Sequence, residues 1–411
     1  MSAAAALRAF AGYGIELEYM IVNRHTLAVM PIADALLRTA AGPQVCDVTR
    51  GEFGWSNEIV LHLVEIKNVR PHPALGPIAA RFQEEVRSIN RLLQPMGARL
   101  MPGGMHPWMD PVADTQLWPH DNAPIYDAYD RIFCCRQHGQ ANLQSMHVNL
   151  PFAGDEEFAR LHAAVRLLLP ILPALAASSP IADGTPSGFL DGRVEAYRNA
   201  VRRVPSVIGE VIPESASSRA QYAAQVLSPM YRDIAPLDPQ GVLQHEWLNA
   251  RAAIARFDRN AIEIRVIDVQ ECPQADLAIA ALAAAVVRAL YDAAFSPLAA
   301  QQAFGTDALV RILLACIRDA DEALIDDGGY LRLLGFPGQR CEAGELWRHL
   351  IAATSLGSSV HWREPLRVMQ EHGPLARRIL RAVGPDGSRG HLQAIYGALC
   401  DCLEEGRMFV G

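Results

Sequence analysis

Two glutamates near the start of the chain lie two residues apart, in the segment 14–22 with the sequence GIELEYMIV. Side chains alternate across a β-strand, so Glu16 and Glu18 are predicted on one face and apolar residues on the other. Two carboxylates held side by side repel each other and lose hydration unless a cation or a polar cleft compensates them. A bound divalent metal ion is the simplest compensation. Taken alone, the pair fits an antiparallel strand with a solvated outer face equally well.

Three further predicted strands also carry polar, ligand-competent side chains on one face. These side chains are Glu58 or Glu65 in 58–68, His147 and Asn149 in 143–150, and Glu263 and Arg265 in 261–268. If the four strands lie in one antiparallel sheet, their shared face offers carboxylates and an imidazole to hard divalent cations, and an arginine to phosphate. Magnesium together with a nucleotide fits this set of ligands.

Each of these residues also has a structural explanation when it is considered singly. His147 fits a hydrogen-bonded histidine of the core, and Glu263 with Arg265 fits an ion pair on the sheet. Coincidence explains one such strand more readily than four. The repeated pattern therefore favours a shared metal and nucleotide site.

The rest of the chain predicts the elements that position these strands. Apolar residues recur at helical spacing over 75–93, which predicts a helix there. Periodicity and the Pro and Gly breaks also predict a short strand over 98–106, an irregular loop over a cleft at 110–124, helices over 126–140 and 155–176, a glycine-bearing loop over 178–192, a hairpin turn at 258–260, and helices from Pro273 almost to the end.

The composition is that of a globular chain with an acidic balance. Hydrophobic residues make up 50% of the 411 residues and charged residues 20%. The net charge of −8 argues against a nucleic-acid partner, because binding to phosphate backbones requires clustered positive charge. Short basic clusters at 198–203 and 377–381 fit anionic ligands or solvated helix faces equally well.

The sequence predicts neither export nor insertion into a membrane. The first ten residues lack a basic stretch followed by an apolar core, and the apolar run 277–287 is shorter than the roughly 20 residues that span a bilayer. Eight cysteines occur without any Cys-x-x-Cys pair, so we expect reduced thiols rather than a zinc knuckle or a disulfide framework. A cytoplasmic location without a membrane partner follows as an expectation.

Several common catalytic and nucleotide-binding motifs are missing from the sequence. It contains neither a P-loop nor a Gly-x-Gly-x-x-Gly run, so those phosphate cradles are not predicted. His245 and Glu246 lack the second histidine of a zincin helix, which argues against a zinc protease.

The order and spacing of several short motifs resemble the glutamate–cysteine ligases of the second type, in the carboxylate–amine ligase group. The motifs are GIELE at 14–18, VEI at 64–66, GGMHPW at 103–108, MHVN at 146–149, ASSP at 177–180 with DG at 183–184, YR at 197–198, and W-x-x-x-R at 247–251 before IEIRV-x-D at 262–268. The resemblance covers residues 12–295. It implies an α+β fold with a curved, mainly antiparallel sheet of the glutamine synthetase and guanido kinase type, flanked by helices.

The same resemblance implies a division of the chain into two regions. Residues 1–297 would form the catalytic core, and residues 298–411 a helical region packed on that core as one structural unit. Covering the active site, stabilising the core and forming a subunit interface, as in a homodimer, are three open roles for the helical region.

The resemblance also assigns roles to individual residues. The metal ligands or their near neighbours would be Glu16, Glu18, Glu65, His147 and Glu263. Arg265 would contact the transferred phosphate, and Arg198 would lie near phosphate or the substrate carboxylate. The catalytic set would then be Arg265, Arg198 and Glu263, and the nucleotide would be bound by Arg265, Arg198, Asn149, Ser178 and Ser179. ATP and two or three Mg²⁺ ions are the implied cofactors.

The chain departs from the pattern of this family at three positions. Ile125 stands where many relatives carry arginine, and Asn149 and Asn249 stand where histidine and aspartate are common. The predicted metal ligands are unaffected, whereas the departures bear on which acid and which amine are bound.

The implied activity joins an acid to an amine at the expense of ATP. The γ-carboxylate of glutamate would be activated as an acyl phosphate and transferred to an amine such as that of cysteine, as in glutathione biosynthesis. Amino acids would then be the small-molecule partners. The alternatives are the same chemistry on another acid or amine in specialised metabolism, a non-catalytic relative that binds a substrate or a peptide, and a phosphagen-kinase-like phosphotransferase.

Overall fold

A computed structural model describes residues 6–42 and 47–411. The described residues form an eight-stranded antiparallel sheet in the order β2-β3-β4-β1-β6-β10-β9, with β5 paired to the second half of β1. The strands are β1 (Gly14–Asn23), β2 (Asp47–Arg50), β3 (Phe53–Asn57), β4 (Leu63–Asn68), β5 (Ala98–Met101), β6 (Ser145–Pro151), β9 (Ala253–Arg256) and β10 (Ala261–Asp268). The prediction of a mainly antiparallel α+β fold is confirmed.

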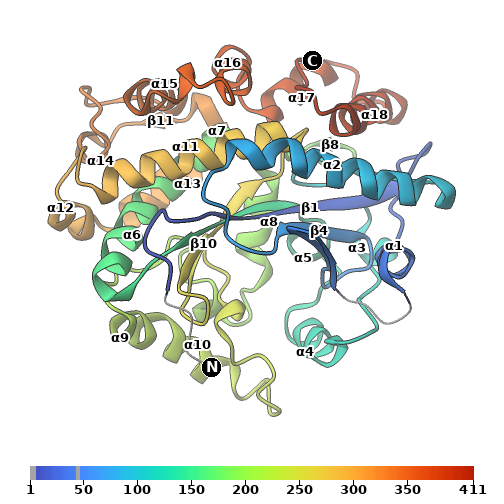
Figure 1. The fold of residues 1–411 in the computed structure, drawn as a ribbon, viewed down its shortest axis with the longest axis horizontal. Coiled ribbons are helices and arrows are strands. Elements are labelled where there is room, and N and C mark those ends of the chain that lie inside the picture. Colours follow the sequence, from blue (N-terminus) through green and yellow to red (C-terminus); the bar gives the residue numbers. More distant parts are fainter. Residues whose placement is uncertain (1–5, 43–46) are drawn as a thin grey trace.

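One face of the sheet packs on three long helices to form the main core. Ile15, Leu17 and Tyr19 of β1 are fully buried and belong to the same apolar cluster as side chains from these helices. The helices are α2 (Gly76–Leu93), α6 (Gly154–Leu168) and α11 (Pro273–Tyr291). Figure 1 shows α2 and α11 running side by side along this face of the sheet. Alternation along β1 therefore places the paired glutamates on the opposite face.

Local sequence explains the two helices that lie along the sheet. In α2 the apolar positions Ile78, Phe82, Val86, Ile89 and Leu93 are buried, as their spacing predicts. Helix α11 begins at Pro273, a residue favoured in the first turn because it needs no amide partner there. Apolar residues then occupy most of its circumference, which suits a helix covered on several sides.

The other face of the sheet is covered by shorter helices and loops. Helix α4 (Ala123–Phe133) and helix α5 (His138–Ala141) lie on the side away from α2 and α11 (Figure 1). The remaining elements of this half of the chain are α1 (Ala33–Ala41), α3 (Pro111–Asp114), α7 (Leu172–Ala176), the hairpin β7 (Ile181–Ala182) and β8 (Thr185–Pro186), α8 (Gly192–Ala200), α9 (Arg219–Tyr222) and α10 (Ser228–Ile234). This face carries the polar side chains of the sheet.

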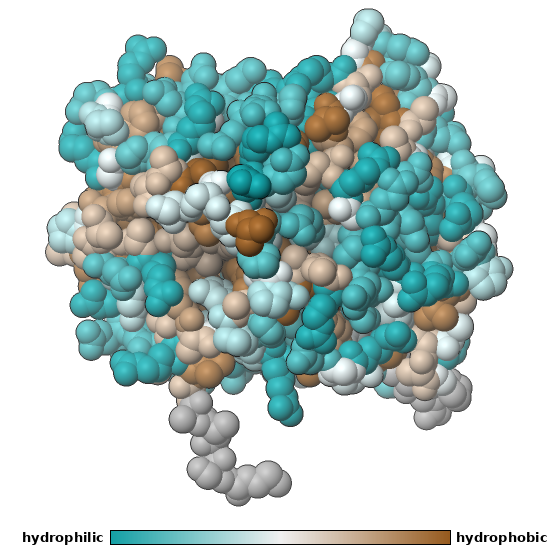
Figure 2. All heavy atoms as spheres, turned by 45° about the horizontal axis from the view of Figure 1, so that its top comes forward, coloured by the Kyte–Doolittle hydropathy of each residue, from teal (hydrophilic) through white to brown (hydrophobic). Residues whose placement is uncertain are grey.

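The C-terminal part of the chain is mainly helical and packs outside α2 and α11. Its elements are α12 (Leu298–Ala303), α13 (Thr306–Asp319), β11 (Leu324–Ile325), α14 (Gly328–Leu333), β12 (Cys341–Glu342), α15 (Ala343–Thr354), α16 (Arg363–His372), α17 (Leu375–Val383) and α18 (Arg389–Glu405). Helices α15 and α16 contact α11, and α18 contacts α2 and β5. Figure 2 shows hydrophobic residues in patches between hydrophilic ones on the face turned forward there.

Several predicted elements differ in the structure, and the loop predicted over 110–124 contains α3. Residues 58–62 form a turn rather than the start of a strand, and 102–106 do not continue β5. The helix predicted over 126–140 breaks after Phe133, where Cys134 has a positive φ of 58°. The helix predicted over 155–176 is interrupted by a 3₁₀ turn at Leu169–Ile171, where Pro170 cannot supply an amide hydrogen. Strands β2 and β3 were not predicted.

Two described stretches are long and apolar enough to cross a membrane by composition. They are Gly154–Ala176 and Pro273–Tyr291, and 94% and 72% of their most apolar windows are buried inside the molecule. Core helices of a globular protein pass the same test, so these stretches are weak evidence for a membrane segment.

Candidate active site

Cross-strand pairing brings the predicted site residues together on the polar face of the sheet. Glu16 on β1 lies opposite His147 on β6, and Glu18 lies opposite Glu65 on β4. Glu263 on β10 lies opposite Asn149, which is two residues beyond His147 on β6. The five predicted metal ligands thus come from four adjacent strands, β4, β1, β6 and β10.

His147 is the centre of this group. Its Nδ1 is 3.0 Å from Oε2 of Glu16, and its Nε2 is 3.0 Å from Oγ of Ser145 and 3.7 Å from Oε1 of Glu18. Burial disfavours a charged imidazole, but the hydrogen bond to Glu16 and the surrounding carboxylates raise the pKa of His147 to about 8. Burial likewise opposes the charge of Glu16, yet the bond and charge of His147 lower the pKa of Glu16 far below its usual range.

Two overlapping groups of side chains could each hold a metal ion. The first is Glu16, His147 and Glu263, and the second is Glu18, Glu65 and His147. In each group the ligand atoms lie within 4.8 Å of one another. Carboxylate oxygens dominate both sets, which suits Mg²⁺ or Mn²⁺. The buried Oδ1 of Asn149 has no hydrogen-bond partner among the described residues, so an acceptor beside Glu16 is left for a cation or its water. The residues present therefore fit divalent cations.

A third carboxyl lies beside the second of these groups. Burial, and then the charges of Glu18 and Glu65, raise the pKa of Glu58 well above its usual range. Burial and the charge of Glu16 also raise the pKa of Glu65 to about 7, against the opposing effect of Lys67. A bound cation would relieve this repulsion, because it favours the charged form of every nearby carboxyl.

Glu18 and Glu65 are also held in place by donors from the surrounding strands. Glu18 accepts hydrogen bonds of 2.8 Å from both the amide and the hydroxyl of Ser145. Glu65 accepts from Ser56 Oγ at 2.7 Å and from Lys67 Nζ at 2.8 Å. Their oxygens are therefore pre-positioned, which lowers the cost of ordering them around an ion.

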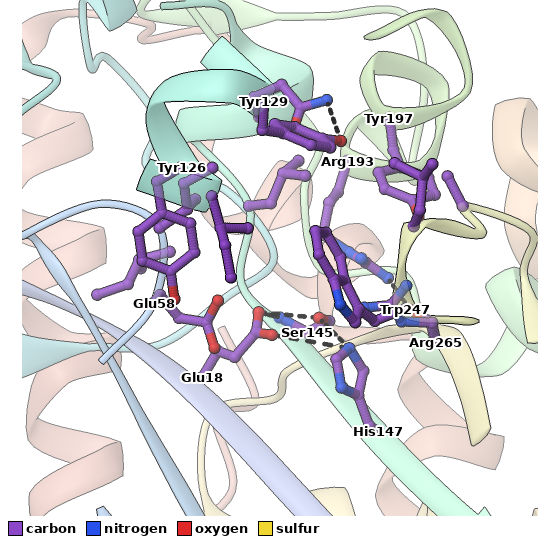
Figure 3. Close-up of a pocket in the computed structure, with 17 residues that line it drawn as sticks. Glu18, Glu58, Tyr126, Tyr129, Ser145, His147, Arg193, Tyr197, Trp247 and Arg265 are labelled. Carbon is purple, nitrogen blue, oxygen red and sulfur yellow. Dashed lines mark hydrogen bonds and ion pairs between the residues drawn. The ribbon is translucent and has the colours of Figure 1, made fainter. Parts of the chain in front are cut away.

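A cavity of about 210 Å³ opens over Glu18 and His147. Figure 3 shows Glu58 and Tyr126 on one side of it, and Tyr197, Trp247 and Arg265 on the other. Its polar floor and mainly aromatic and apolar walls are typical of small-molecule sites.

A larger cavity of about 580 Å³ lies on the other side of the glutamate pair. Glu16, Lys67, Asn68 and Asn149 line it together with apolar residues such as Val48. Because Glu16 lines this cavity and Glu18 the smaller one, the predicted metal ligands lie at the boundary between the two.

Arg265 lies at an irregularity in β10. Ile264 pairs with Val148 and Ile267 with Met146, so β10 contains one more residue than β6 over this interval. Such a β-bulge redirects side chains and is common next to active sites. The Nε of Arg265 is 2.9 Å from Oε1 of Glu263, and Arg265 lines the smaller cavity, where it can reach a phosphate or a carboxylate.

The bulge also turns Asp268 onto the polar face. Asp268 pairs with Ser145 on the polar face. Uninterrupted alternation along β10 would place Asp268 on the other face of the sheet from Glu263. Asp268 is fully buried and accepts hydrogen bonds from the amide of Ser178, the hydroxyl of Ser179 and the guanidinium of Arg193. Arg193 in turn lines the smaller cavity.

Three residues predicted to bind phosphate or nucleotide lie outside both cavities. Ser178 and Ser179 are buried and are engaged by Asp268. Arg198 pairs with Glu195 at 3.1 Å and lines a separate hollow against α13, because it projects from α8 away from Arg193. The structure therefore brings Arg193, rather than Arg198, to the cavity.

Some site residues were not predicted. Alternation along β4 could have identified Lys67, because it follows Glu65 by two residues and so lies on the same face. Arg193 and Tyr126 come from helices, and no local pattern distinguishes them from surface or core residues. Trp247 belongs to one of the family motifs, but no site role was predicted for it.

Sequence comparison agrees with this geometry. Residues 13–320 match the model of glutamate-cysteine ligase family 2. The chain belongs to this family. An uncharacterized protein of Archaeoglobus fulgidus is 30% identical over 400 residues, which cover 97% of this chain and 100% of the relative. The family resemblance predicted from the motifs is confirmed.

Relatives with a stated activity match over shorter stretches. A provisionally named glutamate–cysteine ligase 2-3 of Rubrobacter xylanophilus is 26% identical over 187 residues, which cover 45% of this chain and 47% of the relative. A provisionally named glutamate–cysteine ligase 2 of Cupriavidus metallidurans is 28% identical, with 44% and 46% covered. The alignments thus span less than half the length of these two ligases.

Solved structures show the same fold as this member of glutamate-cysteine ligase family 2. A bifunctional glutathione synthetase from Pasteurella multocida aligns with a TM-score of 0.59 and 14% identity, over 97% of this chain and 52% of that one. A glutamate–cysteine ligase from Francisella tularensis in complex with AMP aligns with a TM-score of 0.58 and 14% identity, over 95% and 88%. At this identity the likeness shows the fold alone.

Proposed function

We propose that this protein is an ATP-dependent carboxylate–amine ligase that activates the γ-carboxylate of glutamate and joins it to an amine. The observation that carries the proposal is the convergence of four glutamates on His147, at the boundary between two cavities. This arrangement suits a reaction in which a nucleotide and an acid approach the same cations from opposite sides. Membership of the ligase family supports it.

The larger cavity suits the nucleotide. Its volume of about 580 Å³ lies within the range typical of sites for ligands of drug size, whereas the smaller cavity suits the acid and the amine. Lys67 lines the larger cavity, where its ammonium can approach phosphate oxygens. Divalent cations, when bound by the glutamates, would neutralise and align those phosphates.

The proposed reaction has two steps. A γ-carboxylate oxygen attacks the terminal phosphorus of ATP, and the bond between that phosphorus and the leaving oxygen of ADP breaks. The amine nitrogen then attacks the acyl carbon, a C–N bond forms, and the C–O bond to phosphate breaks as phosphate leaves with the electron pair. The nitrogen loses its proton to solvent or to a carboxylate. No covalent intermediate with the protein is needed.

The residues of the smaller cavity suit the acid and its phosphorylated form. Arg193 and Arg265 place two guanidinium groups over the polar floor, and guanidinium binds carboxylate and phosphate through paired N–H donors. Glu263 fixes Arg265 and Asp268 fixes Arg193. Positioned cations of this kind stabilise the charge that develops on the phosphoryl group in the transition state.

The test is ADP release that depends on both an acid and an amine. Glu16→Gln and Glu263→Gln remove one ligand charge each and should lower this activity at least 100-fold, with an unchanged circular dichroism spectrum. Glu371→Gln, on the exposed face of α16, is the matched control and should keep full activity. Full activity in both site variants would refute the proposed role of the glutamates.

A separate measurement distinguishes the ligase from a non-catalytic relative. Hydroxylamine converts an acyl phosphate into a stable hydroxamate, so glutamate, Mg-ATP and hydroxylamine should yield γ-glutamyl hydroxamate and ADP. ATP binding with no hydroxamate from any of the twenty amino acids would argue for a binding protein instead.

A further inference from the structure

The two sides of the smaller cavity differ in charge. Arg193, Arg265 and His147 are the positively charged or chargeable residues among the described residues that line it. All three come from β6, β10 or α8. In Figure 3, Arg265 lies with Tyr197 and Trp247, opposite the side that carries Glu58 and Tyr126.

The side that carries Glu58 is apolar apart from its carboxyl and hydroxyl groups and an amide. Its apolar and aromatic residues come from the turn before β4, from the first residue of β4, and from α4. They are Ile59, Leu63, Ile125 and Tyr126. Neither arginine nor lysine lines the cavity from these elements.

Arg193 and Arg265 are both assigned to the acid substrate. In the proposed function they bind its carboxylate and the transferred phosphate, and each is already fixed by a carboxylate of the protein, Arg193 by Asp268 and Arg265 by Glu263. The acceptor must then approach along the apolar side. A carboxylate on the acceptor would lose hydration there without an opposite charge.

An amine gains from the same surroundings. Its amino group can donate a hydrogen bond to the carboxyl of Glu58, and an apolar or aromatic body would pack on Ile125 and Tyr126. We propose that the acceptor is a primary amine with an apolar or aromatic body and without a carboxylate. This inference rests on the proposed ligase function and narrows its amine substrate to a chemical class.

The experiment compares amines that differ only in a carboxylate. The pairs are phenethylamine with phenylalanine, 3-methylbutylamine with leucine, and cysteamine with cysteine. Binding of each to the full chain is measured by calorimetry in the presence of Mg²⁺ and a non-hydrolysable ATP analogue. In each pair we expect the dissociation constant of the carboxylate-free amine to be at least tenfold lower. Equal or tighter binding of the amino acids would overturn the inference.

A substitution on the apolar side tests whether the lack of a positive charge there causes the preference for amines without a carboxylate. Ile125 is only partly buried, so Ile125→Arg can introduce a cation without filling the core. It should tighten the binding of phenylalanine at least tenfold and weaken that of phenethylamine, while Ile125→Leu should leave the preference unchanged. An unchanged preference in Ile125→Arg, with an unaltered melting temperature, would contradict the explanation.

The two assays test acid activation and acceptor binding independently of each other. The hydroxamate assay reports on activation of the acid without any acceptor amine, and calorimetry reports on the acceptor without turnover. Hydroxamate formation together with tighter binding of amino acids would leave the ligase function standing and refute the acceptor class. Tight amine binding without hydroxamate would refute the ligase function, and the cavity would then be an amine-binding site without an acceptor role.

Discussion

The guanidinium Nε of Arg193 donates a hydrogen bond to Oδ1 of Asp268, and both side chains are buried. The same carboxylate binds Ser178 and Ser179, which begin the loop leading to α8. Asp268 thus ties the end of β10 to the helix that carries Arg193. The position of an arginine in the smaller cavity depends on this one carboxylate.

Arg193 should matter more for catalysis than Arg198. Arg193→Ala removes a cation that lines the cavity, and we expect it to lower kcat/KM for the acid about 100-fold. Arg198→Ala removes a cation from a separate hollow, so its loss should be at least tenfold smaller. Steady-state kinetics with varied acid checks both. Equal losses would favour the role that the motif resemblance predicts for Arg198.

Asp268→Ala should destabilise the fold. It leaves Arg193 buried without its partner, and breaking a buried ion pair in this way costs about 3–5 kcal/mol. Urea denaturation should show this loss, whereas Asp326→Ala, at an exposed position before α14, should change the free energy of unfolding by less than about 0.5 kcal/mol. A similar small change for Asp268→Ala would show that the pair contributes nothing.

Gly104→Ala should perturb the same carboxylate by steric overlap. A Cβ at this position would overlap the side chain of Asp268, whereas a Cβ at Gly387 would meet open space. Because Asp268 is held by several donors and cannot move away, we expect Gly104→Ala to cost about 1–3 kcal/mol of unfolding free energy. Gly387→Ala serves as the control in the same urea titration.

The two groups of metal ligands should be separable by mutation. Glu65→Gln affects only the second group and Glu263→Gln only the first, whereas His147→Ala affects both. Calorimetric titration with Mn²⁺ should show one site weakened at least about tenfold in each glutamate variant and both sites weakened in His147→Ala. Unchanged Mn²⁺ binding in all three variants would exclude these residues as ligands.

His162 should make the protein less stable in acid. It is buried against Phe158 and Tyr222, and neither ring nitrogen has a hydrogen-bond partner in the part of the chain that the structure describes. Burial together with Arg166 lowers its pKa to about 3. The unfolded chain, with a histidine pKa near 6.5, binds a proton that the folded chain does not. Stability therefore falls as the pH drops from about 6.5 towards 3, by about 1.4 kcal/mol per pH unit.

Replacement of this histidine should remove that part of the pH dependence. His162→Phe keeps an aromatic ring against Phe158, so the difference in unfolding free energy between variant and parent should grow as the pH falls from 6 to 4. His25→Phe, at an exposed turn, should show no such trend. Urea midpoints measured across this range decide between a buried neutral histidine and one that reaches solvent.

Local patterns in the sequence determined most of the individual elements. Alternation identified β1, β6 and β10 and the shared face of Glu16, Glu18 and His147, and helical spacing identified α2 and α11. These periodicities follow from backbone geometry within a few residues, so they can be read without knowledge of the fold. The order of the family motifs then implied the sheet that unites them.

The tertiary structure alone decided how those faces meet. Pairing of distant strands sets the register that brings Glu16 to His147, and a bulge in β10 moves Asp268 to the polar face against simple alternation. The rotation of α8 selects Arg193 over Arg198 for the cavity. Register, bulges and helix rotation are fixed by packing between segments far apart in the chain, which no local pattern records.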